Sequence, residues 1–421
     1  MYRALWITFL LIPLFFSNCA TYKPFSSDQH IKSILSQDTF VRGIIDSFEA
    51  YEAQIIYTQI HRDQNNIPHF KSFYWNHQPG YYFYPASMVK MPAALAAAEK
   101  VNVLSKEHPG LTLFSPLRID SVRPPQTPVI DDLTAQNTQA SVAQYIKKIF
   151  VVSDNDAYNR LYEFVGQNAL NTRLHELGYK QTHIITRLDA PLFNFESNKY
   201  TNPITFAEED LLLYRQSEQY NNADPRVAGL KSLQKGKGFI SADSLVMGPF
   251  DFSTKNYFSL KDMSDMIRSI LFPASIGASL RWNLTKEQLS YIRSCMMTLP
   301  KESKYPLYDS SHYDGYCKFF MYGDQKTDMP DHIRIFNKVG WAYGYLTDAA
   351  YIVDFKNKTE FILTATINTN TDGIYNDGVY AYQTIGLPFL SRIGRLIYEF
   401  ELKRKKAFLP DLSEFKLKPQ S

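Results

Sequence analysis

The chain has 421 residues, of which 45% are hydrophobic, 21% charged and 15% aromatic. This length is sufficient for a sizeable core, and the composition is that of a soluble globular protein. The formal net charge of +3 gives no reason to expect a nucleic acid as partner. The nine histidines show no spacing typical of a zinc site, so we expect neither a metal nor another cofactor.

The N-terminal segment "MYRALWITFLLIPLFFSNC" has one arginine and then an apolar run that is too short to span a bilayer comfortably. This pattern predicts an export signal over residues 1–18. Its end, "FSNC", resembles a bacterial lipobox and predicts lipidation at Cys19, with plain cleaved secretion as the alternative. We therefore expect an exported protein of the cell envelope or periplasm. A lipid anchor on Cys19 and a polar tether over residues 19–29 would hold it at a membrane.

Strand patterns lie near both ends of the chain, with helical patterns between them. Strands are expected over residues 52–63 and 69–76 as a hairpin, and again over residues 332–344, 347–355 and 359–368. Helices are expected over residues 30–48, 88–104, 141–152, 156–179, 259–272, 285–300 and 386–406. This order predicts one α/β (α+β) domain over residues 30–402, whose sheet joins the two ends of the chain.

Three other segments qualify this organisation. Residues 190–258 are rich in Asn, Gly, Pro and Ser and predict an insertion on the body of the domain. Residues 403–421 form a basic tail. Cys295 and Cys317 either form a disulfide, which an oxidising compartment would permit, or remain two buried free thiols.

Three short motifs follow one another in the chain. Ser87-Met88-Val89-Lys90 opens a predicted helix, Ser153-Asp154-Asn155 lies in a break between helices, and Lys338-Val339-Gly340 lies on a predicted strand. Each motif alone has an ordinary explanation, such as a helix N-cap at Ser87 or turn chemistry at "SDN". The S-x-x-K pattern also occurs at "SLQK" and "SEFK", where no chemistry is expected. Order and setting together favour a functional group of residues over coincidence.

The chemistry of such a group can be stated residue by residue. A serine hydroxyl needs an adjacent base to become a nucleophile, and Lys90 is expected within hydrogen-bonding reach of Ser87, one turn along the helix. Lysine acts as a base when burial or a second cation lowers its pKa, and Lys338 is the candidate cation. Ser153 would relay a proton to the leaving group, and Asn155 would hold the substrate amide.

With these motifs the chain resembles the class A β-lactamases and, more broadly, the penicillin-recognising serine hydrolases. The stretches "SMVKMPAALAAAEK", "SDNDAYNRLYEFVG", "TRLD" and "KVGWAYGYLTDAAYIVD" carry the likeness. The resemblance implies an antiparallel sheet formed from both chain ends and packed against a helical part. It also implies a backbone oxyanion hole at Ser87 and Trp341, next to Gly340, and assigns substrate contacts to Asn155 and Lys338.

Two departures from the family pattern affect the expected mechanism. Val339 replaces a threonine whose hydroxyl helps to hold the substrate carboxylate. In the omega loop, "TRLDAPLFNFESNKYTNP", the glutamate that activates the deacylating water is absent from its usual place. Glu196 is the expected replacement base. Asp189 is the alternative, because its spacing from Ser153 equals the family's serine-to-glutamate offset.

The function that this resemblance implies is hydrolysis through a Ser87 acyl-enzyme, on a β-lactam or a related amide or ester. The alternatives are a penicillin-binding D,D-peptidase-like protein with slow deacylation, and a non-catalytic binding module of the cell envelope on the same fold. The expected partners are a small-molecule or peptidoglycan-derived substrate and, through Cys19, a membrane. We expect a monomer.

Overall fold

The computed structural model describes residues 29–420, so the expected export signal, Cys19 and nearly all of the tether lie outside the described residues. Within the described range, no helix is both long and apolar enough to cross a bilayer.

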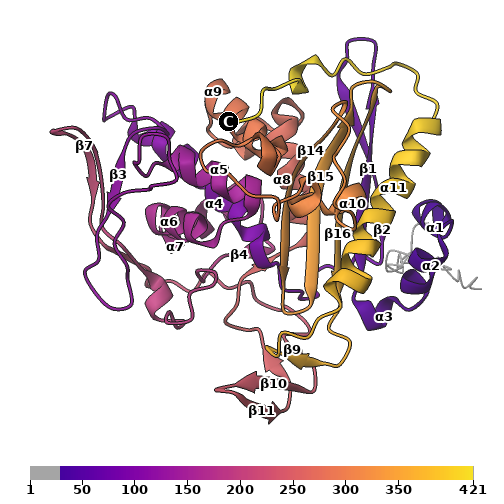
Figure 1. Ribbon diagram of the computed structural model, residues 1–421, viewed down its shortest axis with the longest axis horizontal. Coiled ribbons are helices and arrows are strands. Elements are labelled where there is room, and N and C mark those ends of the chain that lie inside the picture. The colour runs from indigo at the N-terminus through magenta and orange to yellow at the C-terminus, as the bar shows by residue number, and fades with distance from the viewer. Residues whose placement is uncertain (1–28, 421) are drawn as a thin grey trace, which may run out of the picture.

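The main sheet joins the two ends of the chain, as the sequence predicts (Figure 1). Its five strands run in the order β14-β15-β16-β1-β2, and β1 pairs antiparallel with β16. The strands are β1 (Gln54–Arg62), β2 (Pro68–Trp75), β14 (Ile333–Ala342), β15 (Tyr345–Asp354) and β16 (Thr359–Asn368). Strand β14 lies at the edge of the sheet. A two-residue turn with positive φ at Tyr343 and Gly344 connects β14 to β15, which is the conformation of tight hairpins with native twist.

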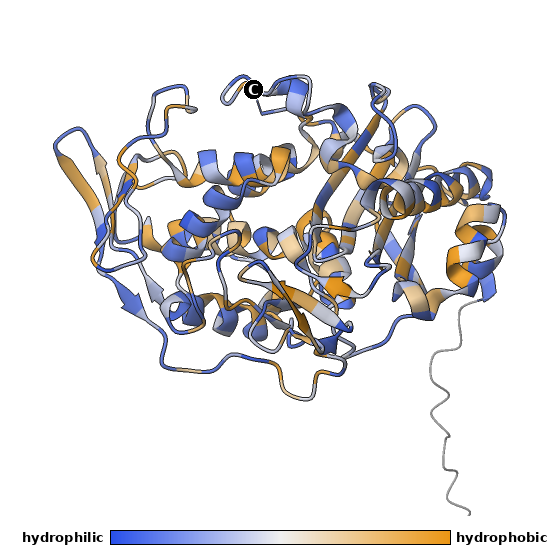
Figure 2. Cartoon of the chain, turned by 60° about the horizontal axis from the view of Figure 1, so that its bottom comes forward, coloured by the Kyte–Doolittle hydropathy of each residue, from blue (hydrophilic) through white to orange (hydrophobic). Residues whose placement is uncertain are grey.

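Helices cover both faces of this sheet (Figure 1). One face packs on α1 (Gln29–Leu35), α2 (Thr39–Asp46), α3 (Phe48–Tyr51), α10 (Phe319–Tyr322) and α11 (Leu387–Lys403). The other faces a helical part made of α4 (Lys90–Leu104), α5 (Val142–Val152), α6 (Asn155–Val165), α7 (Gln167–Glu176), α8 (Leu260–Leu271) and α9 (Lys286–Met297). Hydrophobic residues run through the strands and the inner helices, and hydrophilic residues dominate the outer loops (Figure 2). The molecule therefore has a hydrophobic core on each side of the sheet.

Helix α4 runs through the helical part and is buried on nearly all sides. Its alanines have high helix propensity and small side chains, so α5, α6 and α7 approach it closely. A helix that is apolar all round belongs in a core. This central position fixes the start of α4, where the S-x-x-K motif lies.

Residues 190–258 fold into short strands outside the main sheet. The remaining strands are β3 (Leu117–Ile119), β4 (Thr182–His183), β5 (Tyr200–Thr201), β6 (Ile204–Glu208), β7 (Leu211–Gln216), β8 (Gln219–Tyr220), β9 (Gln234–Lys235), β10 (Gly238–Ser241), β11 (Ser244–Met247), β12 (Phe250–Asp251), β13 (Tyr257–Phe258) and β17 (Ile374–Tyr375). Strand β10 pairs with β17, which follows the main sheet in the chain. The segment is thereby attached to the loop after β16.

The structure differs from the sequence-based expectation at the ends of the domain. The helix expected over residues 30–48 is divided into separate helices, because the Asp38 carboxylate accepts hydrogen bonds from Phe40 N and Val41 N and caps a new helix there. The tail after α11 is partly packed, since Leu412 and Phe415 are buried in the core. Cys295 and Cys317 are both free and buried, as in the second of the two alternatives.

Candidate active site

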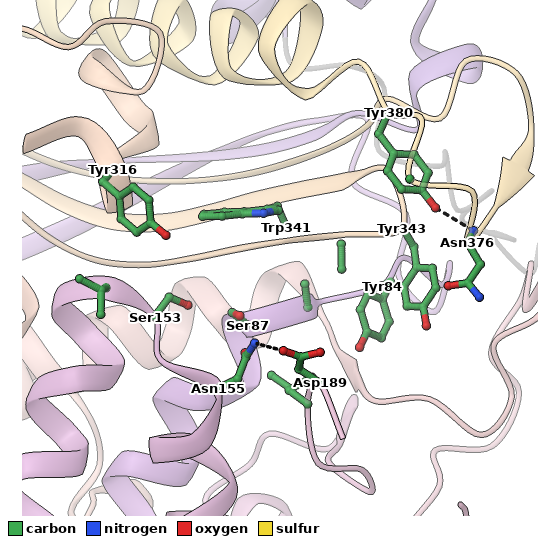
Figure 3. Close-up of a pocket in the computed structure, with 15 residues that line it drawn as sticks. Tyr84, Ser87, Ser153, Asn155, Asp189, Tyr316, Trp341, Tyr343, Asn376 and Tyr380 are labelled. Carbon is green, nitrogen blue, oxygen red and sulfur yellow. Dashed lines mark hydrogen bonds between the residues drawn. The ribbon is translucent and has the colours of Figure 1, made fainter. Parts of the chain in front are cut away.

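Ser87 lies in a 3₁₀ turn (Ala86–Val89) that leads directly into α4, and it lines a cavity of about 570 Å³ (Figure 3). The preceding residue, Ala86, has φ of 47°, a left-handed conformation that costs a non-glycine residue about 1–3 kcal/mol. No side-chain hydrogen bond caps the start of this turn or of α4. The N-cap explanation therefore does not account for Ser87.

Lys90 is fully buried below the cavity. Its Nζ donates to Ser153 O, to Asn155 Oδ1 at 2.6 Å and to Ser153 Oγ at 3.3 Å. The expected hydrogen bond from Lys90 to Ser87 is not formed, because these acceptors of the S-D-N motif hold the Lys90 amino group. Burial, and then the charge of Lys338, lower the pKa of Lys90 well below its usual value.

Lys338, on strand β14 of the sheet, also contacts the Ser153 hydroxyl. Its Nζ donates to Ser153 Oγ at 2.8 Å and to Val339 O at 2.7 Å. Burial lowers the pKa of Lys338 to about 8. Ser153 ends α5 in the left-handed conformation, with φ of 63°. This turn places its hydroxyl between the two lysines, in the break between α5 and α6 where the sequence predicts it.

Asn155 begins α6, while the Asp154 carboxylate caps that helix by accepting from Ala157 N at 2.7 Å. The Asn155 amide links Lys90 to the omega loop, because its Nδ2 donates to Asp189 Oδ2 at 3.4 Å. Asp189 lines the cavity, and Figure 3 shows its carboxylate beside Asn155 on the Ser87 side. The carboxylate of the omega loop that reaches the cavity is thus Asp189.

The structure does not bring Glu196 to this cavity. Its side chain is 64% exposed and pairs with Lys199 at 2.9 Å. The omega loop is anchored at Arg187, whose side chain pairs with buried Glu163 at 2.9 Å and whose backbone N–H donates to Asn198 Oδ1. This anchoring puts Asp189 at the cavity and leaves Glu196 on the surface.

Gly340 lets β14 pass against the nucleophile turn. A Cβ atom at residue 340 would lie 2.6 Å from Pro85 O and 2.9 Å from Ser87 N, closer than any side chain tolerates. The next residue, Trp341, lines the cavity. The absence of a side chain at Gly340 therefore lets the backbone of β14 lie against the Ser87 turn, beside the cavity that Ser87 and Trp341 line.

A second buried network supports β14 from below. Lys318 Nζ donates to Asn337 Oδ1 at 2.7 Å, and Asn337 Nδ2 donates to Asp348 Oδ1 at 2.9 Å. Burial lowers the pKa of Lys318 to about 8 and raises that of Asp348 to about 7. These groups lie on β14, on β15 and just before α10, so they tie the part of β14 next to Lys338 to its neighbouring elements.

Sequence reasoning missed the aromatic walls of the cavity. These walls contain Tyr84, Tyr316, Tyr343 and Tyr380, with Asn376 at the rim (Figure 3). The high aromatic content was the one available signal, and it did not indicate which rings meet. Among residues 29–420, no cluster of His, Cys, Asp and Glu side chains is arranged to hold a metal ion.

The sheet of both chain ends and the ordered S-x-x-K, S-D-N and K-x-G motifs define a protein of the penicillin-recognising serine hydrolase superfamily. The sequence model of the beta-lactamase enzyme family matches residues 40–271, more than half of the chain. The chain belongs to this family. A search of curated proteins finds no match.

Solved structures that this chain resembles at TM-scores below 0.5 include β-lactamases and PBP-A. A β-lactamase from Sphaerobacter thermophilus DSM 20745 is 13% identical, with a TM-score of 0.47 over 87% of this chain and 98% of that one. A β-lactamase from Xanthomonas campestris pv. campestris str. ATCC 33913 is 14% identical, with a TM-score of 0.45 over 88% and 97%. PBP-A is 14% identical, with a TM-score of 0.46 over 90% and 96%. These likenesses are too distant to transfer an activity to this chain.

Proposed function

We propose that this protein is a serine hydrolase that forms an acyl-enzyme at Ser87 with a β-lactam or a related amide or ester. The observation that carries the proposal is the buried pair Lys90 and Lys338, which share the Ser153 hydroxyl directly beneath a cavity lined by Ser87. Two like charges this close disfavour each other. The charge of Lys338 is one of the causes that lower the pKa of Lys90, so in this proposal Lys90 is the neutral member and the base.

In the acylation step, Ser87 Oγ attacks the carbonyl carbon of the substrate and gives its proton to neutral Lys90 Nζ. Apo hydrogen bonds at catalytic sites often tighten only when substrate is bound. The proton then passes through the Ser153 hydroxyl to the leaving nitrogen or oxygen as its bond to the carbonyl carbon breaks. Lys338 stabilises the Ser153 oxygen during this transfer.

The negative charge that develops on the carbonyl oxygen needs preorganised donors. The backbone N–H groups of Ser87 and Trp341 supply them in this proposal, and the close approach at Gly340 sets their separation. Removal of one such donor typically costs about 10²–10³ in kcat.

Deacylation requires a base for water, and we assign this role to Asp189 in place of Glu196. Asp189 lines the cavity, and its carboxylate contacts Asn155, which in turn contacts Lys90. Water activated by Asp189 would attack the Ser87 ester, release the acid and return the proton to Ser87 through Lys90. Glu196, paired with Lys199 at the surface, cannot serve without leaving that ion pair.

One observation favours a second candidate, a penicillin-binding protein with slow deacylation. Asp189 is one methylene shorter than the family's glutamate, and its contact with Asn155, at 3.4 Å, is long. With a poorly placed base, the acyl-enzyme would be hydrolysed slowly and would accumulate. The N-terminal segment supports the further proposal that the protein acts outside the cytoplasm, anchored through Cys19, where peptidoglycan-derived peptides would be available.

The test combines labelling with turnover. The wild type, Ser87→Ala and Glu196→Gln are each incubated with a fluorescent penicillin, with a chromogenic cephalosporin and with a reactive phosphonofluoridate. Labelling that is lost in Ser87→Ala and kept in Glu196→Gln supports the proposal. Cephalosporin turnover then indicates a β-lactamase, and labelling without turnover indicates the penicillin-binding candidate. A wild type that none of the reagents modifies would refute the hydrolase and leave a non-catalytic binding module.

A further inference from the structure

The charges around the cavity are unusual for a site expected to receive a substrate carboxylate. Of the described residues that line it, Asp189 carries a formal charge, and no arginine or lysine is among them. Lys90 and Lys338 are 0% and 2% exposed and lie beneath the floor. Lys338 directs its bonds to Ser153 Oγ and Val339 O. The lining residues that a substrate contacts therefore carry one negative formal charge and no positive one, and the two lysines act only from beneath Ser153 and Asn155.

Val339 adds no charged or polar group to the lining of the cavity. Its side chain is buried in the core on the α11 side of the sheet and does not line the cavity. Residue 339 therefore places no polar group in the cavity to bind a substrate carboxylate beside Lys338. A carboxylate in the cavity would have no cation among the lining residues to pair with and would be repelled by Asp189.

Aromatic rings form two groups along this cavity. Tyr316 and Trp341 lie on one side, with ring centroids 6.0 Å apart in an edge-on contact, and Trp341 is 38% exposed (Figure 3). Tyr84 and Tyr343 lie toward the other end, with centroids 5.0 Å apart. Such rings offer a large contact area for a planar group and lose little conformational entropy when they bind it.

Residues 190–258 hold the second group of rings in place. Phe250 contacts Tyr343 at 5.5 Å between centroids, and Phe252 contacts both Tyr343 and Tyr84. At the rim, Asn376 Nδ2 donates to Ile240 O at 3.0 Å. The segment that interrupts the helical pattern of the sequence thus supports the wall of the cavity, which makes the ring positions preorganised.

We propose that the cavity selects acyl donors that carry an aromatic ring and no carboxylate beside the scissile carbonyl. This inference rests on the proposed function, and it names the substrate class of the same site. The aromatic ring of the acyl donor packs between the two groups of rings. Its uncharged leaving group avoids electrostatic repulsion by Asp189. Within the proposed range of substrates, a penicillin, which carries a carboxylate, on this account acylates Ser87 more slowly than an uncharged amide or ester that carries an aromatic ring.

The test uses a matched set of thioesters with the wild-type protein. The acyl group is N-phenylacetylglycyl or N-acetylglycyl, and the leaving thiol is mercaptoacetamide or mercaptoacetate. In each case Ser87 Oγ forms an ester bond to the acyl carbon and the carbon–sulfur bond breaks. The serine proton passes through Lys90 and Ser153 to the thiolate, and the released thiol is measured with a chromogenic disulfide. Water then hydrolyses the ester and returns the free acid.

The expected kcat/KM is about 10-fold higher for phenylacetylglycyl than for acetylglycyl donors, and about 10-fold higher for the amide than for the carboxylate leaving group. Trp341→Leu is expected to reduce the ratio between the acyl groups toward unity. Phe408→Leu, an exposed ring in the C-terminal tail, is the matched control and keeps both ratios. In Asp189→Asn, the initial burst rates of thiol release from the amide and the carboxylate leaving groups are expected to differ less than in the wild type.

Two kinds of failure are distinguishable. A preference for the carboxylate, or equal rates for both acyl groups, would overturn this inference while leaving Ser87 acylation intact. If Ser87 reacts with no thioester and with no phosphonofluoridate, the proposed function itself fails. Unchanged ratios in Trp341→Leu would also overturn the assignment of the ring contact to this wall.

Discussion

Lys338 Nζ donates a 2.8 Å hydrogen bond to Ser153 Oγ, which lies 185 residues earlier in the chain. This contact joins the K-x-G strand to the S-D-N turn, and the same Ser153 hydroxyl also accepts from Lys90. A single hydroxyl therefore lies between two buried lysines. The arrangement explains why one lysine can lose its proton while the other keeps it.

The pH dependence of acylation follows from this pair. Acylation needs neutral Lys90, so its rate is expected to rise with pH through the lowered pKa of Lys90. It also needs protonated Lys338, so the rate is expected to fall as the pH rises above about 8, where Lys338 loses its proton. Arginine stays charged across this range. Lys338→Arg is therefore expected to lose the alkaline fall, as measured by burst kinetics of acylation across pH.

The control for this profile is Lys237→Arg, which changes an exposed lysine on residues 190–258 and should leave both limbs in place. An alkaline fall that persists unchanged in an active Lys338→Arg protein would contradict the assignment of that limb to Lys338.

Deacylation is expected to depend on Asp189. Asp189→Asn keeps the contact with Asn155 but removes the base, so hydrolysis of the acyl-enzyme should slow about 10²-fold or more. Acylation should be affected less, because Lys90 and Ser153 are unchanged. The measurement is the decay of the acyl-enzyme, followed by intact-protein mass spectrometry after excess reagent is removed.

Glu196→Gln is the matched control for the same experiment. Its carboxylate is exposed and pairs with Lys199, so its loss is expected to leave the decay rate within about twofold. The account of deacylation would be wrong if Glu196→Gln stabilised the acyl-enzyme and Asp189→Asn did not.

Gly340 is expected to tolerate no side chain. In Gly340→Ala the new Cβ would meet the backbone at Pro85 and Ser87, and relief of that overlap would move β14 away from the nucleophile turn. Overpacking of this kind costs about 1–3 kcal/mol of unfolding free energy, together with a large loss of acylation. Denaturant unfolding and the labelling rate measure the two effects separately.

Gly277→Ala provides the comparison, because a Cβ at Gly277 has open space around it and the residue has no positive φ. Its unfolding free energy should change by no more than about 0.5 kcal/mol. Normal acylation in Gly340→Ala would show that the close approach of β14 is not required for the oxyanion site.

The sheet and the motif positions could be predicted from the sequence because their signals are local. Alternation marks β14, β15 and β16, and the alanine-rich run marks α4. The hairpin of β1 and β2 also matches its prediction. The division of the first helix at Asp38 is a capping effect that apolar periodicity alone does not reveal.

The side-chain contacts of the site were harder to predict from the sequence, since they depend on which acceptors a flexible side chain reaches in the folded protein. Spacing placed Lys90 beside Ser87, but its Nζ binds Ser153 and Asn155. The choice between Asp189 and Glu196 depends on how Arg187 and Asn198 anchor the omega loop. The aromatic walls come from segments far apart in the chain, so no local pattern could bring them together.

The most direct test of the central claim is to locate the acyl group. Asp189→Asn is incubated with the phenylacetylglycyl thioester of mercaptoacetamide and with the phosphonofluoridate, then digested and sequenced by mass spectrometry, with Ser87→Ala in parallel. The account predicts one adduct per chain, on the peptide that contains Ser87, and none in Ser87→Ala. An adduct on another residue, or an unmodified Ser87 with both reagents, would contradict it.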